Sequence, residues 1–524
     1  MNTKRPLHFF NTTGPCNPID HYMLPPADRL VGAQLHRYIS DKLYWVLHAP
    51  RQTGKTTFLQ NWMREINAGD EAIACYVSVE EGQNIADREK GMRIIYRSIC
   101  DFADWGGLPI PLVEDPNHEG LLRGTLKKWA ELVAPKPLIV LFDEVDVLVG
   151  ETMISFLRQL RGGFADRGVG KFPISIALVG MRDLKDYITA SKGGVAPNPG
   201  SPFNIKADSA VLSSFSRTDV AHLFAQRTDE TGQQITQEAL DYVYEQSKGQ
   251  PWIVNNLFMR ATLRILDQEN TETVTLSHIR EARQQMVLAR ETHLDALAYR
   301  LQESGVREVI EPILTGETNP DLAEGNGFRL CLDLGLVAID DGTPVIANPI
   351  YREVIARHLT YGPQLAIPKP EWQWKQSDGS LDMDRMMREF QRFWRRHSEV
   401  WETKTRSEYT EAFPHLLLMA FLQRILNGGG NVERECAAGR GRMDLFIEYN
   451  DYKYIIEIKL IYYYNTPEAV KEEGLEQIRP YRDKVAPTAP VYLVIFDRRP
   501  QTKEKSWDER ILWEREGEVT VLWC

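Results

Sequence analysis

The sequence predicts a multidomain α/β protein, with one α/β domain at each end and a mainly helical part between them. Between residues ~40 and ~195, short apolar strands alternate with helical stretches, which predicts a parallel sheet with crossover helices. From ~215 to ~310 the pattern is helical, and a second α/β pattern starts near Tyr409. At 524 residues the chain is too long for a single hydrophobic core.

Composition and charge restrict the class of protein. Hydrophobic residues make up 43% of the chain and charged residues 26%, which is ordinary for a soluble globular protein. No apolar run could cross a bilayer and the first residues lack an apolar signal segment, so we expect a cytoplasmic protein without a membrane partner. Six cysteines without a CxxC pair argue against a structural zinc site. The net charge of -11 argues against a generally basic nucleic-acid surface, although local basic clusters occur.

The N-terminal α/β pattern contains four strand candidates. They are Leu43–His48, Ala74–Val79, Leu138–Asp143 and Ile174–Gly180. A loop rich in Gly and Pro, 193–202, follows the last of them. The next, helical part has predicted helix starts at Ser216 and Ser277, because hydroxyl residues cap helix N-termini.

A short pattern of helix, strand, turn, strand and helix occupies residues ~325 to ~360. The strands Leu336–Ile339 and Val345–Ala347 flank a turn at Asp340–Pro344, which predicts the wing of a winged-helix domain. Three prolines in 363–370 then predict a stiff linker, and an aromatic and charged helix over Asp382–Trp401 follows it.

A phosphate-binding loop is predicted at Ala49–Thr56, with the sequence Ala-Pro-Arg-Gln-Thr-Gly-Lys-Thr. It follows a strand and leads into a helix near Lys55, so that backbone N–H groups can wrap phosphates at a helix N-terminus. Lys55 would reach the β- and γ-phosphates of ATP, and the Thr56 hydroxyl would bind Mg²⁺. The predicted nucleotide-binding residues of the loop are Arg51, Gln52, Thr53, Gly54, Lys55, Thr56 and Thr57.

The second half of this site is predicted at the end of the apolar strand Leu138–Asp143. Ligands bind at the carboxyl ends of strands in open α/β sheets, so Asp143 is placed to hold Mg²⁺ through water. Glu144 would polarise the attacking water. Asp146 is either a further polar contact or only a charge near a helix N-terminus.

These motifs resemble the P-loop ATPases of the AAA and STAND kind, over residues 1–290. The resemblance implies that Phe10–Pro26 covers the adenine, that Arg182 is a sensor residue, and that Pro251 of Gly249-Gln-Pro251 packs near the base from a helical lid. Two alternatives stay open. Arg182 can instead form an ion pair with Asp183 or Asp186, and Gly249-Gln-Pro251 can be a plain helix end followed by a new helix.

A carboxylate and lysine cluster is predicted near the C-terminus. Two strands joined by a tight turn at Asn450-Asp451 would place Tyr449 opposite Tyr452 and Asp444 opposite Glu457. Opposed side chains share one face of the sheet, and Lys459 lies two positions beyond Glu457 on that face. Hard oxygen ligands suit Mg²⁺ or Mn²⁺, and the ammonium can orient or help deprotonate a water.

This cluster resembles the PD-(D/E)XK, or restriction-endonuclease-like, superfamily, over residues ~405–524. The resemblance implies that Asp444, Glu457 and Lys459 are catalytic, although Met443 replaces the motif's proline. It also implies a metal site of Asp444, Glu457 and the helical Glu411, for which Glu408 is the competing choice. The predicted substrate contacts are Arg440, Arg442 and the QxxxY pair Gln477 and Tyr481. Two alternatives stay open. The residues can form an edge hairpin whose charges only face solvent, or the domain can have this fold without catalytic activity.

The predicted division has five parts: 1–205 P-loop ATPase core, 206–290 helical lid, 291–362 winged helix, 363–404 linker and helix, and 405–524 nuclease-like domain. It predicts an ATP-controlled, metal-dependent nuclease acting on nucleic acid, with DNA favoured; defence or mobile-element maintenance is an analogy. The alternatives are an ATP-driven switch whose C-terminal domain binds without cleaving, and a DNA-tracking motor or loader. A homo-oligomer is left open.

Overall fold

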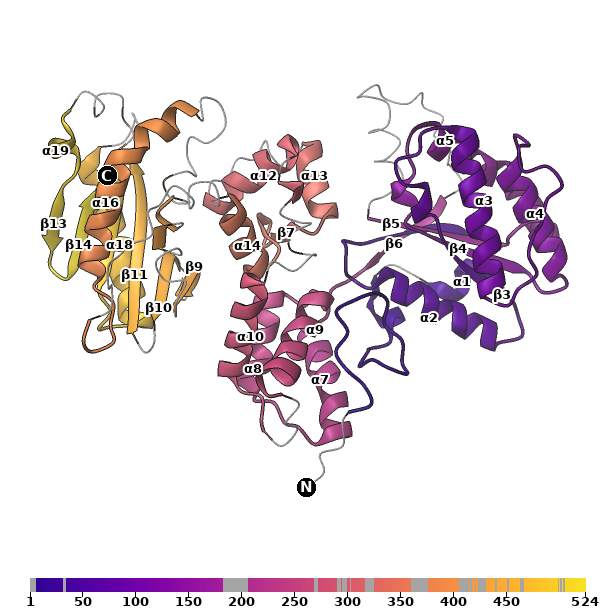
Figure 1. The fold of residues 1–524 in the computed structure, drawn as a ribbon, viewed down its shortest axis with the longest axis horizontal. Coiled ribbons are helices and arrows are strands. Elements are labelled where there is room, and N and C mark those ends of the chain that lie inside the picture. The colour runs from indigo at the N-terminus through magenta and orange to yellow at the C-terminus, as the bar shows by residue number, and fades with distance from the viewer. Residues whose placement is uncertain are drawn as a thin grey trace. The chain divides into compact units, whose positions relative to one another are not determined.

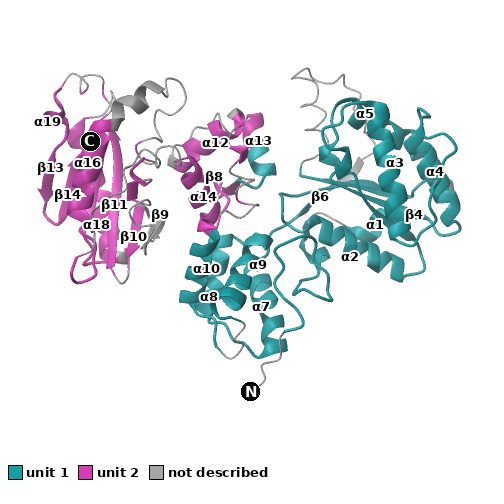
Figure 2. Ribbon diagram, viewed as in Figure 1, with its two compact units in different colours: residues 1–286, 330–336 teal, residues 287–329, 337–524 magenta. Residues whose placement is uncertain are grey.

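The computed structural model describes most of the chain. The described residues are 6–31, 34–181, 206–267, 272–289, 294, 299–301, 303–315, 325–359, 376–404, 414, 417–419, 421–422, 430–438, 441–449, 452–461, 466–497, 499, 502 and 505–524. They form two compact units, of residues 1–286 with 330–336 and of residues 287–329 with 337–524 (Figure 2). None of their helices is long and apolar enough to span a bilayer.

The first unit is built on a six-stranded sheet with the order β1-β6-β2-β5-β4-β3 (Figure 1). Its strands are β1 Leu30–Val31, β2 Tyr44–His48, β3 Ile73–Ser78, β4 Leu138–Asp143, β5 Ser175–Gly180 and β6 Lys206–Leu212. All pair in parallel except β1, which runs antiparallel to β6. The four predicted strands are therefore confirmed within one or two residues, and the sequence missed β1 and β6.

Helices cover both faces of this sheet, as crossover connections between parallel strands require. The helices are α1 Leu35–Ser40, α2 Lys55–Ala68, α3 Arg88–Trp105, α4 Leu121–Val133 and α5 Gly150–Gly163. One apolar core joins α3, α4 and α5 to residues such as Val140 and Phe142. The other joins α1 and α2 to the opposite face through residues such as Trp45 and Leu141.

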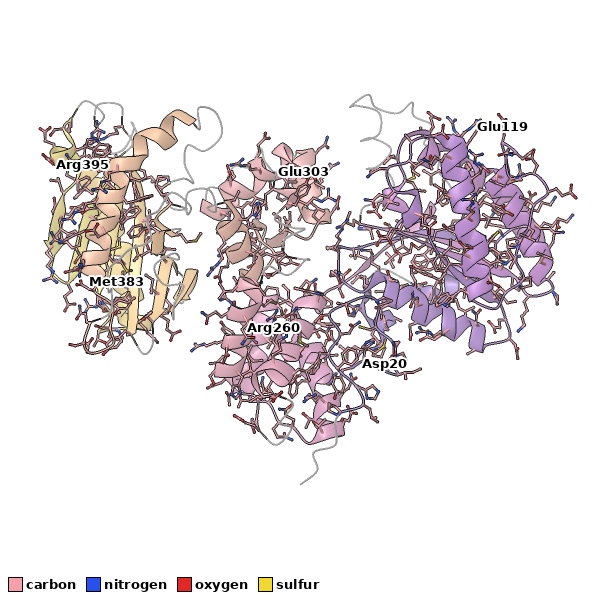
Figure 3. The ribbon with its side chains drawn as sticks, in the orientation of Figure 1. Asp20, Glu119, Arg260, Glu303, Met383 and Arg395 are labelled. Carbon is pink, nitrogen blue, oxygen red and sulfur yellow. The ribbon has the colours of Figure 1, made fainter. Side chains whose placement is uncertain are left out.

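The helices of the part predicted as a helical lid follow β6 in the same unit. It contains α7 Arg217–Thr231, α8 Gln237–Ser247, α9 Pro251–Met259 and α10 Leu276–Leu288. Ser216 caps α7 in a capping box with Asp219, which confirms the predicted start. The second predicted start is displaced, because α10 already begins at Leu276 and Ser277 lies in its first turn. Arg260, at the end of α9, is only 1% exposed and lies among the lid helices (Figure 3).

The predicted pattern around a short hairpin is also present. Strands β7 Val337–Asp340 and β8 Thr343–Ile346 pair antiparallel. Asp341 and Gly342 form the turn with positive φ angles of 46° and 76°. Helices α12 Ser304–Thr315 and α13 Asn326–Asp333 precede the hairpin, and α14 Pro349–Leu359 follows it. The winged-helix assignment itself stays a prediction, as does the five-part division.

The C-terminal sheet has the order β13-β14-β12-β11-β10-β9. Its strands are β9 Gly430–Ala438, β10 Gly441–Tyr449, β11 Tyr452–Ile461, β12 Val491–Asp497, β13 Trp513–Glu516 and β14 Val519–Trp523. β9, β10 and β11 are antiparallel neighbours, whereas β11, β12 and β14 run parallel.

Each face of this sheet has its own apolar core. Helix α16, Met383–Lys404, packs through Met386 and Phe390 on the face that carries Ile456. Helix α18, Pro467–Val485, connects β11 to β12 and packs through Ile478 on the face that carries Ile455. A short helix, α19 Trp507–Arg510, completes the domain. Because successive residues of a strand alternate between faces, Glu457 and Lys459 share the α18 face with Ile455.

Candidate functional site

The predicted phosphate loop connects β2 to α2. Gly54 caps α2 in the left-handed region with φ 95°, and Gln52 has φ 60°. The Lys55 ammonium donates hydrogen bonds to the carbonyl oxygens of Ala49 at 2.8 Å and Pro50 at 3.1 Å. It therefore lies inside the curve of the loop, where it would meet phosphate oxygens. Burial lowers the pKa of Lys55, against the attraction of nearby carboxylates.

Gly54 is needed for two reasons. Its positive φ strains any residue with a side chain, and an added Cβ would lie 3.0 Å from Nη2 of Arg29. Arg29 itself donates from Nη2 to the Thr53 carbonyl at 2.9 Å and from Nη1 to the Ser213 carbonyl at 3.0 Å. The buried Arg29 guanidinium thus links the phosphate loop to Ser213, the residue that follows β6. This role could not be predicted, because Arg29 belongs to no sequence motif.

The magnesium side of the site joins two oxygen ligands. The Thr56 hydroxyl donates to Oδ2 of Asp143 at 2.6 Å, and the Tyr76 hydroxyl donates to the same oxygen at 3.1 Å. Asp143 is fully buried, which raises its pKa, while the bond from Thr56 and the charge of Lys55 act in the opposite direction. A hydroxyl and a carboxylate this close can both bind a hard cation such as Mg²⁺. The charge of the cation would then keep the Asp143 carboxylate ionised, in place of the hydrogen-bond donors.

Glu144 follows directly in a strained backbone conformation, with φ 57°. Such strain in a residue with a side chain is typical of functional sites. Burial, and next the charges of Asp143 and Asp146, raise the pKa of Glu144 to about 7. A carboxylate with such a pKa can accept a proton from an attacking water near neutral pH.

This pKa predicts how nucleotide hydrolysis depends on pH. Glu144 is protonated below about pH 7 and cannot act as a base there, so the rate should fall about tenfold per pH unit below that point and level off above it. The charge of the exposed Glu80 also raises the pKa of Glu144. Glu80→Gln should therefore move the fall in rate to lower pH and leave the rate at high pH unchanged. The measurement is kcat/KM from pH 5.5 to 8.5, because kcat/KM reports the pKa values of the free protein, and a flat profile would contradict this role.

A pocket opens beside the loop between three segments of the first unit. It encloses about 570 Å³, part of it open to solvent. Its walls are the N-terminal segment, the phosphate loop with the start of α2, and the lid helix α9. Its lining includes Arg29, Gln52, Gly54, Phe215, Trp252 and Asn255. The pocket is open to solvent, and Gln52, Thr53 and Gly54 of the phosphate loop form part of its wall.

The N-terminal segment is fixed against the lid and the loop. The Tyr22 hydroxyl donates to Glu230 at 2.6 Å, and Phe10 packs against the rings of Phe224 and Phe258. The Cys16 N–H donates to the Thr57 hydroxyl at 3.0 Å. The predicted covering segment thus closes one side of the pocket, with Pro251 in the wall as well.

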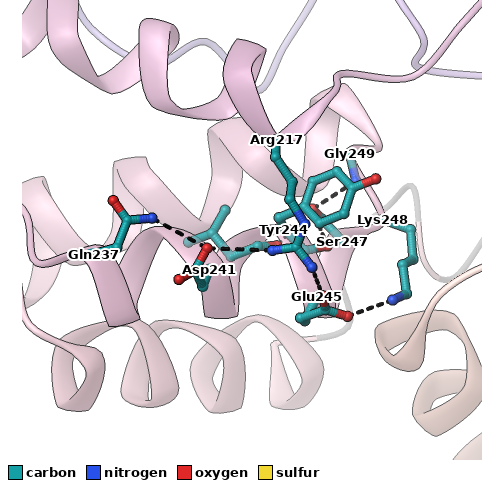
Figure 4. A network of polar contacts seen from close by, with 9 residues as sticks. Arg217, Gln237, Asp241, Tyr244, Glu245, Ser247, Lys248 and Gly249 are labelled. Carbon is teal, nitrogen blue, oxygen red and sulfur yellow. Dashed lines mark hydrogen bonds and ion pairs between the residues drawn. The ribbon is translucent and has the colours of Figure 1, made fainter.

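The lid reaches the loop through the predicted Gly249-Gln-Pro251 turn. Gln250 donates from Nε2 to the Gln52 carbonyl at 3.2 Å and caps α9 by accepting from the Ile253 N–H at 2.7 Å. A polar network lies just before this turn, where Arg217 of α7 contacts Asp241 and Glu245 of α8 and Ser247 accepts from the Gly249 N–H (Figure 4). Arg51 is exposed and does not line the pocket, and Arg182 lies outside the described residues.

The nuclease candidate lies on the β10–β11 hairpin, whose predicted register is confirmed. Tyr449 pairs with Tyr452 and Leu445 with Ile456. The described pairs end there, and the same register continued by one step would bring position 444 of β10 opposite position 457 of β11. The turn at Asn450-Asp451 lies outside the described residues.

Lys459 is the centre of the described contacts on this face. Its ammonium lies 3.8 Å from Oε1 of Glu457, which is only 3% exposed. It also donates to Oε1 of Gln477 at 2.5 Å and to Oε1 of Glu473 at 2.9 Å. The glutamine of the predicted QxxxY motif thus contacts the motif lysine, since α18 crosses the strand that carries it.

The close approach of α18 to the sheet depends on Gly474. A Cβ there would lie 2.6 Å from Cδ1 of Leu493 and 3.3 Å from Cγ of Lys459. A glycine therefore allows the helix to lie near enough for Gln477 to reach Lys459. No sequence motif pointed to Gly474 or Glu473.

Several predicted residues cannot be placed by their side chains. Position 444 is described only as backbone of β10, position 442 likewise, and position 481 only as backbone of α18. Arg440 and Glu411 lie outside the described residues. Within the described side chains no group of three or more His, Cys, Asp or Glu comes together as a metal site. The roles predicted for all these residues remain predictions.

Comparison with known proteins gives a family only for the C-terminal part. Residues 409–495 match the model of the PD-(D/E)XK nuclease superfamily. No curated protein matches the chain.

The solved structures that are similar to this chain at low identity include the following three. The Walker-type ATPase PABY2304 of Pyrococcus abyssi has 14% identity and a TM-score of 0.45, covering 61% of this chain and 93% of that one. The RuvB Holliday junction branch migration motor of Thermotoga maritima has 12% identity and a TM-score of 0.32, covering 64% and 91%. Cdc6p from Pyrobaculum aerophilum has 15% identity and a TM-score of 0.31, covering 61% and 88%.

The fold of the first unit is established by its own geometry. The phosphate loop follows β2, which lies between β5 and β6, and the acidic strand β4 lies on the other side of β5. Lys55 and Thr56 of the phosphate loop face Asp143 at the end of β4. The first unit thus has the sheet order and phosphate loop of a P-loop fold, and residues 409–495 of the C-terminal domain match the model of the PD-(D/E)XK nuclease superfamily.

Proposed function

We propose that the first unit binds and hydrolyses ATP with Mg²⁺, and that the state of its nucleotide site controls a metal-dependent nuclease in the C-terminal domain. One observation carries the proposal: a single chain holds a formed phosphate loop and a hairpin of the predicted register in which Glu457 lies beside Lys459. The substrate is nucleic acid, with DNA favoured.

The first site supports hydrolysis as well as binding. Lys55 is held where it can neutralise phosphate charge, and the Thr56–Asp143 pair offers Mg²⁺ two oxygen ligands. Glu144 supplies a base whose pKa lies near neutral pH. Charge neutralisation, a metal and an oriented water are the elements that phosphoryl transfer needs.

The second site supports phosphodiester cleavage. Asp444 and Glu457, with Glu411, would hold Mg²⁺ or Mn²⁺, which polarises a phosphoryl oxygen and supplies a nucleophilic water. Lys459 would orient that water, and Gln477 would hold the ammonium in place. Arg440, Arg442 and Tyr481 would contact the nucleic-acid backbone.

Control would pass through the lid, because the lid and the N-terminal segment both contact the nucleotide pocket. ATP would change how these segments pack, and the elements that follow the lid in the chain would carry that change. The helices α12 to α14 with the β7–β8 hairpin would grip duplex DNA as a winged helix.

The test measures cleavage and nucleotide use together. Purified protein is incubated with single-stranded DNA, duplex DNA or RNA, with Mg²⁺ or Mn²⁺, and with or without ATP. We expect DNA cleavage that changes at least about fivefold with ATP in the wild type and does not respond to ATP in Lys55→Ala, because the variant loses the phosphate contact. Equal cleavage by both proteins under all nucleotide conditions would contradict the control. Binding of DNA without cleavage would favour the switch that binds only.

A further inference from the structure

Tyr76 is a buried tyrosine beside the magnesium side of the nucleotide site, and it belongs to no sequence motif. It is 6% exposed and lies on β3, where it pairs with Leu141 of β4. Residues two apart on a strand share one face of the sheet, so Asp143 lies on the same face as Leu141. Tyr76 and Leu141 pack there in one core with residues of α2. From this face the Tyr76 hydroxyl reaches the Asp143 carboxylate at 3.1 Å.

Three hydrogen bonds hold the Asp143 carboxylate. Oδ2 accepts from the hydroxyls of Thr56 at 2.6 Å and Tyr76 at 3.1 Å. Oδ1 accepts from the Glu144 N–H at 3.0 Å. An ionised carboxylate has about four acceptor positions, two on each oxygen. Counting the donors in the described part of the chain, both positions of Oδ2 are taken and one position of Oδ1 is open.

The Tyr76 hydroxyl restricts a rotation that is otherwise loose. The last torsion of an aspartate side chain has broad minima, so hydrogen-bond partners set the plane of its carboxylate. The hydroxyl itself is held in place, because β3 is paired with β4 and the Tyr76 ring makes a T-shaped contact with Phe102, with 5.2 Å between the ring centres. Mg²⁺ requires a nearly ideal octahedral arrangement of its ligands. A carboxylate that is held in one orientation therefore suits Mg²⁺ better than one that can rotate.

We propose that Tyr76 is a positioning residue of the metal site: its hydroxyl fixes the orientation of Asp143, so that Oδ1 presents its open position to Mg²⁺ or to a water held by Mg²⁺. The proposal rests on the ATP site proposed above and adds a residue that acts through Asp143. Thr56 holds Oδ2 from α2, and Tyr76 holds the same oxygen from β3. Loss of an outer hydrogen bond to a metal ligand typically lowers metal affinity about 10- to 100-fold.

The experiment compares the wild type with Tyr76→Phe and Tyr44→Phe. Tyr76→Phe removes one hydroxyl and keeps the ring. Tyr44 is the matched control, because it lies on β2 of the same sheet, is fully buried, and donates its hydroxyl at 3.0 Å to the Pro173 carbonyl instead of a metal ligand.

Three measurements are made on each protein. Titration calorimetry in EDTA gives the affinity for metal-free ATP. The EPR signal of free Mn²⁺, titrated into the protein with bound ADP, gives the affinity for the metal without turnover. The rate of ATP hydrolysis against Mg²⁺ concentration gives the half-saturating Mg²⁺ concentration and the maximal rate.

In Tyr76→Phe we expect the Mn²⁺ dissociation constant and the half-saturating Mg²⁺ concentration to rise about tenfold. Excess Mg²⁺ should restore at least about half of the wild-type rate, and the affinity for metal-free ATP should stay unchanged, because the phosphate loop is intact. Tyr44→Phe should keep the wild-type metal constants.

Wild-type metal affinity in Tyr76→Phe would overturn the proposal. An equal loss of metal affinity in Tyr44→Phe would also overturn it, since the effect would then come from stability rather than from position. Weaker binding of metal-free ATP by Tyr76→Phe would overturn it as well, because the phosphate loop would have changed. A wild type that binds no ATP, with or without metal, would overturn the proposed function and the role of Tyr76 together.

Discussion

Glu457→Gln should reduce nucleic-acid cleavage by at least about 100-fold and leave ATP hydrolysis within about twofold of the wild type. The change keeps the size of a side chain that is 3% exposed but removes its charge. A neutral amide is a poor ligand for a hard divalent cation, so the metal that polarises the phosphate would be lost. Lys459 would also lose a carboxylate 3.8 Å away, although it keeps its bond to Glu473. Initial rates of DNA cleavage and of phosphate release from ATP measure the two effects.

Glu448→Gln is the control for this variant. It makes the same change of charge on the same hairpin, but Glu448 pairs with Lys453 near the turn, away from Lys459. We expect Glu448→Gln to cleave DNA at the wild-type rate. If both variants lose activity equally, the loss reflects the charge or stability of the hairpin rather than a metal ligand. If Glu457→Gln keeps full cleavage, the catalytic site lies elsewhere.

The hairpin could be predicted because its evidence is local. The strands alternate with a period of two and are joined by a tight turn, and these two features together fix which residues face each other. The pairing of Tyr449 with Tyr452 therefore followed from the sequence alone. The phosphate loop was predictable for a similar reason, since β2, the loop and α2 are consecutive in the chain.

Strand β6 could not be predicted in this way. Its sequence, Lys-Ala-Asp-Ser-Ala-Val-Leu, has neither an apolar run like that of β4 nor a regular alternation. It is a strand because it completes the hydrogen bonds of β2 on one side and of β1 on the other. Pairing of this kind between distant segments overrides local propensity.

The lining of the pocket also depends on distant segments. Arg29 and Asn255 belong to no motif, and each looks like an ordinary polar residue in the sequence. Their place in the pocket becomes visible only when the N-terminal segment, the phosphate loop and α9 are brought together. The sequence predicted that adenine would bind near Pro251, but it could not predict that Arg29 and Asn255 line the same pocket.

Gly249→Ala should destabilise the first unit by about 2–4 kcal/mol and lower its melting temperature by about 5–10 °C. Gly249 has a φ of 76°, and a Cβ there would lie 1.8 Å from the carbonyl oxygen and 2.8 Å from the carbonyl carbon of Phe215. Both atoms belong to the backbone, so no side-chain rotation can relieve the overlap. The N–H of Phe215 also donates to the Gly249 carbonyl at 2.8 Å, and a backbone shift would break this bond. Differential scanning calorimetry measures the loss.

Gly232→Ala separates the overlap from the backbone strain. Gly232 ends α7 with a similar φ of 80°, but a Cβ there meets no atom within 4 Å. Gly232→Ala should lower the free energy of unfolding only by the backbone strain, which is about 1 kcal/mol. Because Gln250 and Pro251 follow Gly249 directly and reach the loop and the pocket, Gly249→Ala should also weaken ATP binding, whereas Gly232→Ala should not. Equal losses of stability in both variants would show that close packing of the lid turn against Phe215 does not hold the lid in place.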